Sequence, residues 1–239
     1  MTQITPISRA MHCGRTIAIA AFALSISAPA LAGRPLVFAG ASFGEHGERG
    51  EYLGITAPFF SSHYFTQRLA ISDYYYQYGA NGTTVRVRGE AVEAALGAQT
   101  AWQGGWVEAS SGVRYRENRV TPSGANAHAD GGQFGLPLGL QGEQRFGQDW
   151  AANGIVFYAI GPASYWGRAR FLHRTFGDAW AGVEVIKHGD PDYRATQGGL
   201  VLTGIKVGET FTLGFFAGVK KTSGQPRSFY GGAELTKGF

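Results

Sequence analysis

Residues 211–220 read FTLGFFAGVK, in which the odd-numbered residues are all apolar and the even-numbered ones include Thr, Gly and Lys. Successive side chains of a β-strand point to opposite faces of the sheet, so this two-residue period predicts a strand with one apolar face. The same alternation recurs within residues 104–116, 132–145 and 164–176. The sequence therefore indicates a protein made mainly of strands.

Turn-forming residues divide the chain after Gly33 into about twelve candidate strands. Clusters of Gly, Asn, Asp and Pro separate the alternating segments, as expected for tight connections. Several segments are longer than the usual strand of a soluble sheet, and a tilted membrane-crossing strand needs about 9–11 residues. The predicted strands are 36–43, 51–60, 66–78, 83–98, 104–116, 132–145, 150–160, 164–176, 180–188, 193–206, 210–221 and 228–239.

The fold class that follows is all-β, with a single antiparallel transmembrane β-barrel of about 12 strands. Lipid cannot satisfy the open edge of a sheet, so a sheet in a membrane must close on itself. The even strand number and the terminal aromatic Phe239 agree with this class. The alternative is a soluble periplasmic β-sandwich, which would also alternate and contain many glycines. Whole strands with one apolar and one polar face favour the barrel.

Composition excludes several other classes of protein. The 239 residues include 37 Gly and a single Cys, and charged residues make up 16%. Coiled coils and charged disordered chains need far more charge, and one Cys cannot build a disulfide or zinc scaffold. The net charge is +4 and the basic residues are dispersed, so no nucleic-acid partner is expected.

The first 32 residues have the three parts of a secretory signal peptide. Arg9 and Arg15 precede an apolar run, 16–26, and Ala30-Leu31-Ala32 forms a small-residue cleavage site. We expect cleavage near Ala32/Gly33, which leaves residues 33–239 as the barrel and removes the single cysteine. The predicted location is the bacterial outer membrane, with outer-membrane lipid as a partner.

Connection lengths predict which end of the barrel faces outward. If the first strand starts in the periplasm, segments 44–50, 117–131, 189–192 and 222–227 lie outside, and 146–149, 177–179 and 207–209 lie inside. The longest connection then lies outside, as in outer-membrane barrels.

The polar face contains charged residues that we expect to point into the lumen, because a charge at mid-membrane on the lipid face is costly. They have two interpretations: ion pairs that fill a narrow interior, or a polar conduit or groove for a hydroxyl-rich or anionic chain. The lumen-facing candidates are Arg86, Arg88, Glu108, Arg114, Arg116, Glu143, Arg168, Arg170, Glu184 and Glu234.

Aromatic residues near the strand ends also have two interpretations, a girdle at the membrane interface or a stacking path for sugars. These residues are Trp102, Trp106, Trp150, Tyr158, Trp166 and Trp180. The histidines are scattered without metal-ligand spacing, and no Ser stands in a nucleophile elbow. We therefore predict no catalytic residues, no metal and no cofactor, and the protein is not expected to be an enzyme.

Three stretches resemble a known family. They are GVRYR at 112–116, SYWGRAR at 164–170, and Gly182-Val183-Glu184 followed by Gly189 and Tyr193. The chain from about residue 104 resembles the alphaproteobacterial cellulose biosynthesis protein BcsS family, although Val183 stands where the family pattern has proline. The resemblance implies an outer-membrane β-barrel associated with cellulose production, and it carries over no catalytic residues. It also implies the cellulose synthase machinery and a glucan chain as partners.

The functional hypothesis is an accessory barrel for the biosynthesis and export of an exopolysaccharide, which we expect to be cellulose. Such a protein would take part in transport and bacterial secretion. It would act as a conduit or as an outer-membrane anchor. The alternative is a general or small-solute porin. A lipid-modifying enzyme of the outer membrane is the less favoured third hypothesis, since a Ser/His pair can form in space without a sequence motif.

Overall fold

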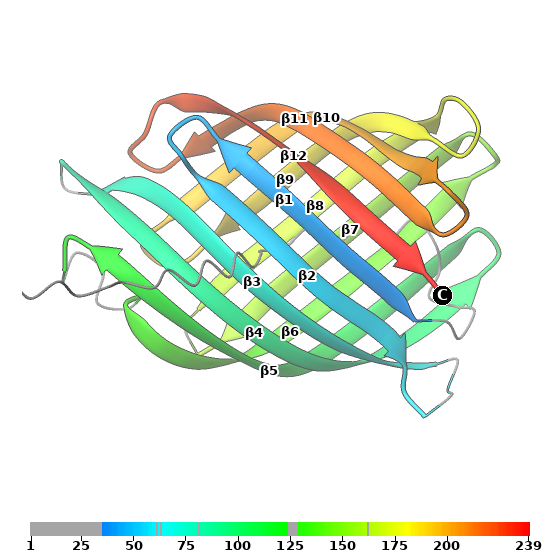
Figure 1. Cartoon of the computed structure of the whole chain (residues 1–239), viewed down its shortest axis with the longest axis horizontal. Coiled ribbons are helices and arrows are strands. Elements are labelled where there is room, and N and C mark those ends of the chain that lie inside the picture. The colour runs from blue at the N-terminus through cyan, green and yellow to red at the C-terminus, as the bar shows by residue number, and fades with distance from the viewer. Residues whose placement is uncertain (1–34, 61, 63, 81, 124–128, 162) are drawn as a thin grey trace, which may run out of the picture.

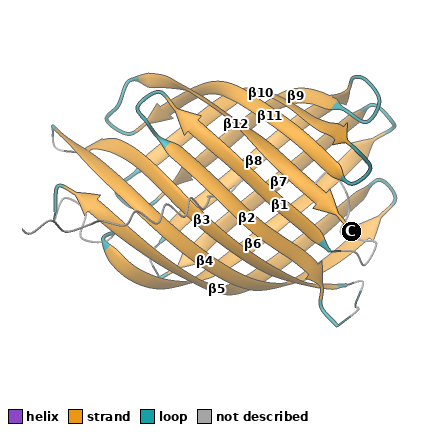
Figure 2. Ribbon diagram, in the orientation of Figure 1, coloured by secondary structure: helices purple, strands orange, loops and turns teal. Residues whose placement is uncertain are grey.

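The computed structural model of the chain describes residues 35–60, 62, 64–80, 82–123, 129–161 and 163–239. The predicted signal peptide, residues 1–32, lies outside these described residues. Strands joined by short connections make up the described chain (Figure 2). They are β1 (Leu36–Gly44), β2 (Arg49–Pro58), β3 (Phe65–Ala80), β4 (Thr83–Trp102), β5 (Gly105–Thr121), β6 (Gly131–Phe146), β7 (Trp150–Ile160), β8 (Ser164–Arg174), β9 (Trp180–Gly189), β10 (Arg194–Val207), β11 (Phe211–Thr222) and β12 (Arg227–Gly238).

The twelve strands form one closed antiparallel barrel in which each strand pairs with its sequence neighbours (Figure 1). The first and last strands complete the closure, with Leu36 opposite Gly238 at one end and Gly44 opposite Tyr230 at the other. Every described strand is therefore paired on both sides, which is the condition for a sheet in lipid. The prediction of a 12-stranded all-β barrel is confirmed.

The barrel has two ends, which we name by the chain termini. The terminal end carries Phe239, whose N–H donates to the Pro35 carbonyl at 3.2 Å, and the connections 59–64, 103–104, 147–149, 175–179 and 208–210. The distal end carries the connections 45–48, 81–82, 122–130, 161–163, 190–193 and 223–226.

Strands β3 to β5 extend the sheet at the distal end (Figure 1). β3 and β5 are longer there than the sequence predicts, whereas β4 begins at the predicted Thr83 and is longer at the terminal end, where it continues to Trp102. β4 has 20 residues and β5 has 17, and β5 continues to Thr121 instead of ending at Arg116. The expected 117–131 loop is therefore shortened to 122–130. It is still the longest connection. The other connections at the distal end are closer in length to those at the terminal end than the sequence predicts.

The outer face of the barrel is apolar along most of its strands. Large exposed side chains such as Leu138, Val156, Phe171, Leu200 and Phe215 point away from the interior, at 45–70% exposure. A non-polar outer band on a closed barrel is the surface that lipid acyl chains cover. Within the described residues, no helix is long and apolar enough to cross a membrane.

Candidate functional site: a vestibule above a buried ion cluster

Four charged residues form an ion cluster in the middle of the barrel. The alternation of β8 points Arg168 and Arg170 inward, and Leu172 follows on the same face. Arg168 Nη1 lies 2.6 Å from Glu234 Oε1 of β12. Arg170 binds two carboxylates, through Nη2 to Glu184 Oε2 at 2.8 Å and through Nη1 to Glu234 Oε2 at 3.0 Å. The four side chains are 0–2% exposed, so this central ion cluster is closed to solvent.

The central ion cluster joins strands that are not neighbours in the sheet. β8 and β12 are separated by β9, β10 and β11, so a contact between them crosses the interior. Tyr230 of β12 extends the cluster by donating its hydroxyl to Glu184 Oε1 at 3.1 Å. Two buried arginines and two buried carboxylates balance in charge, which is what makes their burial tolerable.

A second set of polar contacts bridges the opposite side of the interior. Arg68 of β3 donates to Glu93 Oε1 of β4 at 2.6 Å, and its guanidinium lies 4.8 Å from the ring centre of Phe157 of β7. Nearby, Glu108 accepts hydrogen bonds from Thr66 Oγ1 and Gln141 Nε2, both at 3.1 Å. Together with the central ion cluster, these side chains fill the barrel at mid-height. We call this set of side chains the mid-barrel layer.

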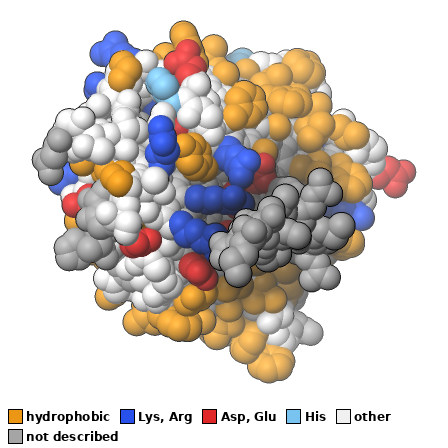
Figure 3. All heavy atoms as spheres, turned by 60° about the vertical axis from the view of Figure 1, so that its left-hand side comes forward, with side chains coloured by type: hydrophobic (Ala, Val, Ile, Leu, Met, Phe, Trp, Pro, Cys, Tyr) orange, Lys and Arg blue, Asp and Glu red, His pale blue; other side chains and the backbone are white. Residues whose placement is uncertain are grey.

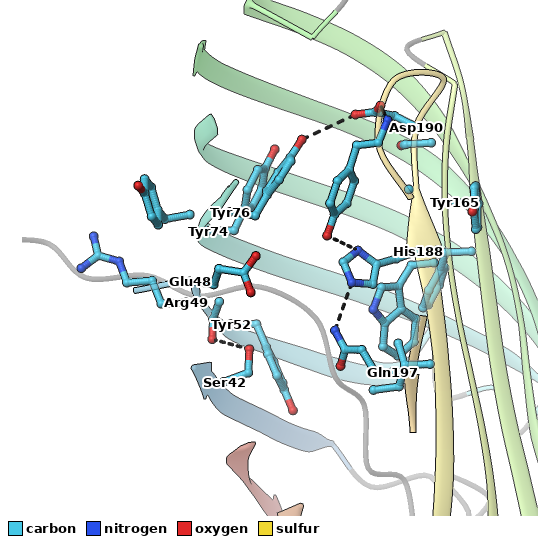
Figure 4. Close-up of a pocket in the computed structure, with 18 of the residues that line it drawn as sticks. Ser42, Glu48, Arg49, Tyr52, Tyr74, Tyr76, Tyr165, His188, Asp190 and Gln197 are labelled. Atoms are coloured by element: carbon cyan, nitrogen blue, oxygen red, sulfur yellow. Dashed lines mark hydrogen bonds between the residues drawn. The ribbon is translucent and has the colours of Figure 1, made fainter. Parts of the chain in front are cut away.

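Above this layer, the distal half of the barrel contains a cavity of about 230 Å³, which we call the vestibule. Tyr52, Glu93 and Tyr230 line it near the mid-barrel layer, and Glu48 and Asp190 line it near the distal end. Lys and Arg side chains gather near the middle of the distal end (Figure 3). Residues from β1, β2, β3 and β9 surround the cavity (Figure 4).

Tyrosines dominate one wall of the vestibule. Tyr74, Tyr76 and Tyr78 occupy alternate positions of β3 and therefore share its inner face. Consecutive rings along this row are 6.1 and 6.3 Å apart, and Tyr193 packs against Tyr76 with ring centres 4.5 Å apart. Tyr74 is fixed by a 2.7 Å hydrogen bond to Asn118 Oδ1.

Gly89 of β4 makes room for the bond between Tyr74 and Asn118. A Cβ atom at position 89 would collide with the Asn118 side chain and the Tyr74 ring. A larger residue at position 89 would therefore displace Tyr74, the first tyrosine of the row, and change the shape of this wall of the vestibule.

The opposite wall carries Asp190 and His188 (Figure 4). Asp190 Oδ1 accepts the backbone N–H groups of Asp192 and Tyr193, both at 2.9 Å, so the turn 190–193 holds this carboxylate in place. Its other oxygen faces the Tyr76 hydroxyl at 3.5 Å. Burial raises the pKa of Asp190, while the two backbone N–H groups and the charge of Arg116 act in the opposite direction.

His188 has polar neighbours on both ring nitrogens. The Tyr193 hydroxyl lies 3.4 Å from Nδ1 and the Gln197 amide nitrogen 3.1 Å from Nε2. On the same side, Lys220 Nζ donates to Glu48 Oε2 at 2.9 Å, which places an ion pair at the distal rim. The vestibule thus offers aromatic faces, hydroxyls, carboxylates and cations within one space.

Buried hydrogen-bonding capacity remains at the base of the vestibule. Among the described residues, Glu93 Oε2 and the Nε and Nη1 atoms of Arg68 have no hydrogen-bond partner. Buried polar groups are normally paired, with protein or with a bound molecule. Of these two residues, Glu93 lines the vestibule and Arg68 does not.

The structure places eight of the ten lumen-facing candidates on the inner face. Arg168, Arg170, Glu184 and Glu234 form the central ion cluster, and Glu108 lies in the neighbouring polar layer. Arg114 and Arg116 of β5 line the vestibule. Glu143 is buried and binds Arg145 Nε at 3.0 Å near the terminal end.

Arg86 and Arg88 are the exceptions, and the expectation that they face the lumen is corrected. Both are exposed on the outer face of β4, whereas Val85 and Val87, at 1% and 0% exposure, point inward. The distal part of β4 belongs to the extended sheet, where the inner face packs against Tyr78. Outward charge is inexpensive once a strand leaves the hydrocarbon.

The six aromatic candidates divide between the two faces. Trp102, Trp150 and Tyr158 are 43–49% exposed on the outside, as in an interface girdle. The other three, Trp106, Trp166 and Trp180, pack inside the barrel. The tyrosine row was missed, although the run Tyr74-Tyr75-Tyr76-Gln77-Tyr78 already shows it by its two-residue period.

The closed antiparallel barrel, its apolar outer band and its ionic interior define the class of protein as an outer-membrane β-barrel. Solved structures of that class share the fold. The KdgM porin matches with a TM-score of 0.54 and 9% identity over 85% of this chain and 99% of that chain. The COG4313 outer membrane channel from Pseudomonas putida F1 matches with a TM-score of 0.54 and 8% identity over 86% of this chain and 94% of that chain.

A third barrel, the translocator domain of the autotransporter NalP from Neisseria meningitidis, matches with a TM-score of 0.51 and 14% identity over 86% of this chain and 88% of that chain. No curated protein matches the sequence. The family model for cellulose biosynthesis protein BcsS matches residues 29–239. The chain belongs to that family, as the resemblance in its sequence implies.

Proposed function

We propose that this barrel is an accessory protein of cellulose production that holds a short segment of glucan in the vestibule. The family places the protein in cellulose biosynthesis. The observation that carries the finer proposal is a vestibule with aromatic and hydroxyl-bonding walls above a filled mid-barrel layer. Such a site suits binding at one end better than passage of a chain along the axis.

The chemistry of the vestibule walls fits a neutral glucan. Each sugar ring has apolar faces that pack on aromatic rings and hydroxyl groups that both donate and accept hydrogen bonds. The row of Tyr74 and Tyr76 supplies the rings, and Asp190 and Glu93 supply acceptors. The cavity is smaller than the usual range of about 300–1,000 Å³ for ligand pockets, so the occupant is a short stretch of chain.

A porin is the alternative function. The fold alone agrees with it, since channels such as KdgM and COG4313 share the architecture. KdgM has also been described in complex with disordered oligogalacturonate, which is an acidic saccharide. Against small-solute conduction, the central ion cluster joins β8 to β12 through contacts of 2.6–3.0 Å and leaves those side chains nearly unexposed.

The test is binding of cellohexaose to the purified barrel, measured by calorimetry. Tyr76→Ala and Asp190→Asn should each weaken binding about tenfold, because each removes a wall contact. Tyr115→Ala is the matched control, since Tyr115 packs against Phe134 on the outer face. Equal weakening by all three variants, or no binding by the unaltered barrel, would contradict the proposal.

Reconstitution into liposomes distinguishes holding from conduction. The unaltered barrel should give no more glucose influx than liposomes without protein. Arg168→Ala combined with Arg170→Ala removes both cations of the central ion cluster, and it should lower thermal stability. With equal amounts of the variant inserted in the membrane, cellulose output should be unchanged, and a specific loss of polymer would favour a conduit.

A further inference from the structure

The outer face of β2 to β5 carries three parallel rows of side chains. Strand register aligns the first row, Leu53, Ile71, Val92 and Tyr115, at the edge of the apolar band. Two residues further toward the distal end the row is entirely acidic, with Glu51, Asp73, Glu90 and Glu117. The next row contains Arg49, Tyr75, Arg88 and Arg119. The surface changes from apolar to charged at one register in all four strands.

Asp73 organises the basic row. Although it points outward, it is only 2% exposed, because Arg49 and Arg88 cover it from the two neighbouring strands. Arg49 Nε lies 3.8 Å from Oδ1, and Arg88 Nη2 lies 3.8 Å from Oδ2. One carboxylate therefore gathers two guanidinium groups at a single point on the outside of the barrel.

Both arginines remain accessible from outside. Their side chains are 50% and 58% exposed, and 3.8 Å is longer than a hydrogen bond. Their N–H groups are consequently available to an external acceptor. A planar guanidinium matches the oxygens of a phosphate group and binds it through two parallel hydrogen bonds.

We propose that this surface binds a phosphorylated membrane lipid. The acyl chains lie along the apolar row that ends at Leu53, Ile71 and Val92, and a phosphate of the headgroup binds Arg49 and Arg88. Two arguments identify the occupant: the paired cations complement a phosphate, and they lie only four residues along β2 and β4 from the apolar row that acyl chains cover, beyond the acidic row. The inference stands independently of glucan binding, since these residues lie outside the barrel.

Native mass spectrometry of the detergent-purified barrel tests the inference, with bisphosphorylated lipid A as the probe. The unaltered protein should retain lipid A and should lose retention at least about tenfold when the lipid is enzymatically dephosphorylated. Arg49→Gln combined with Arg88→Gln should weaken retention by a similar factor. The control removes two exposed cations elsewhere on the distal rim, Lys187→Gln and Arg227→Gln, and should change retention less than twofold.

Asp73→Asn distinguishes a site with positioned arginines from non-specific electrostatic attraction. The variant has lost one negative charge, so non-specific attraction predicts tighter retention of the anionic lipid. A site that depends on Asp73 to place Arg49 and Arg88 predicts weaker retention. Tighter retention by Asp73→Asn, an equal effect of the control pair, or indifference to dephosphorylation would each overturn the proposal. Arg49→Lys with Arg88→Lys keeps the charge and should still weaken retention, which covers the case in which Asp73→Asn fails to fold.

Discussion

Arg170 of β8 and Glu234 of β12 face each other inside the barrel, with Nη1 3.0 Å from Oε2, although three strands separate β8 from β12 in the closed sheet. The contact therefore fastens two distant parts of the wall to each other. Glu234 also binds Arg168 at 2.6 Å, so one carboxylate compensates two buried cations. Removal of this carboxylate should have a larger effect than removal of a single surface charge.

Glu234→Gln should destabilise the barrel by about 3–5 kcal/mol, because it leaves buried positive charge without its partner. The measurement is the temperature at which the folded, fast-migrating band disappears in semi-native electrophoresis. Glu90→Gln is the matched control, since Glu90 is exposed on the outer face, and it should change that temperature little. Equal shifts for the two variants would show that the central ion cluster contributes no special stability.

Arg168→Met added to Glu234→Gln should restore part of the lost stability. The double variant again has equal numbers of buried positive and negative charges, because Arg170 keeps Glu184 at 2.8 Å. Coupled sites give non-additive changes, so the double variant should be more stable than Glu234→Gln alone. Additive losses would mean that Arg168 contributes mainly through packing, for example against Trp166, whose ring centre lies 5.8 Å from its guanidinium carbon.

Gly204 should be the more sensitive of two glycines with positive φ near the terminal end. It lies at the irregularity in β10, between Leu202 and Ile205, with φ +80°, and an added Cβ would collide with the Asp178 carbonyl. Gly208 has φ +64° but open space around it. Gly204→Ala should therefore lower stability by about 1–3 kcal/mol and Gly208→Ala by less. Comparison of the two unfolding temperatures checks this prediction. An equal loss of stability in both variants would mean that the positive φ alone causes the loss and that the collision with the Asp178 carbonyl adds nothing.

The pH dependence of stability should reveal the burial of Asp190. Burial raises its pKa above the ordinary 3.8, so the folded state binds this proton more tightly than the unfolded state does. The resulting stabilisation is fully present below pH 3.8 and is lost as the pH rises through the raised pKa. Asp190→Asn keeps an oxygen for the backbone N–H groups of Asp192 and Tyr193 but does not titrate.

The measurement is the unfolding temperature of the unaltered protein minus that of Asp190→Asn, followed from pH 3.8 upward. The difference should fall across that range. Asp178→Asn, at an exposed position of the terminal end, serves as the control. A difference that rises with pH would reverse the sign of the argument and show that the turn stabilises the ionised carboxylate more than burial penalises it.

The sequence is sufficient to predict the strands because their periodicity is local. The predicted segment 150–160 coincides with β7, and the alternation of 164–176 correctly predicts the parity of Arg168 and Arg170. Arg86 and Arg88 show the limit of the same rule. Alternation indicates which residues share a face but not which face is inside. In the apolar band the apolar face of a strand points outward, whereas beyond the band the valines of β4 point inward and its arginines point outward. The contacts of Glu234 depend on closure between β1 and β12, which no local pattern encodes.

The distal end should face the outside of the cell. It carries the longest connection, 122–130, and the extended sheet of β3 to β5, and outer-membrane barrels place their larger connections outside. A cysteine at Ser123, which is exposed, should react with a membrane-impermeant thiol reagent on intact cells. A cysteine at Glu209, in the connection between β10 and β11, should react only after the outer membrane is permeabilised.

Both variants lack other thiols in the mature chain if the single native cysteine, Cys13, is removed with the predicted signal peptide. Labelling of Glu209→Cys but not Ser123→Cys on intact cells would reverse the orientation, and the vestibule would then open toward the periplasm.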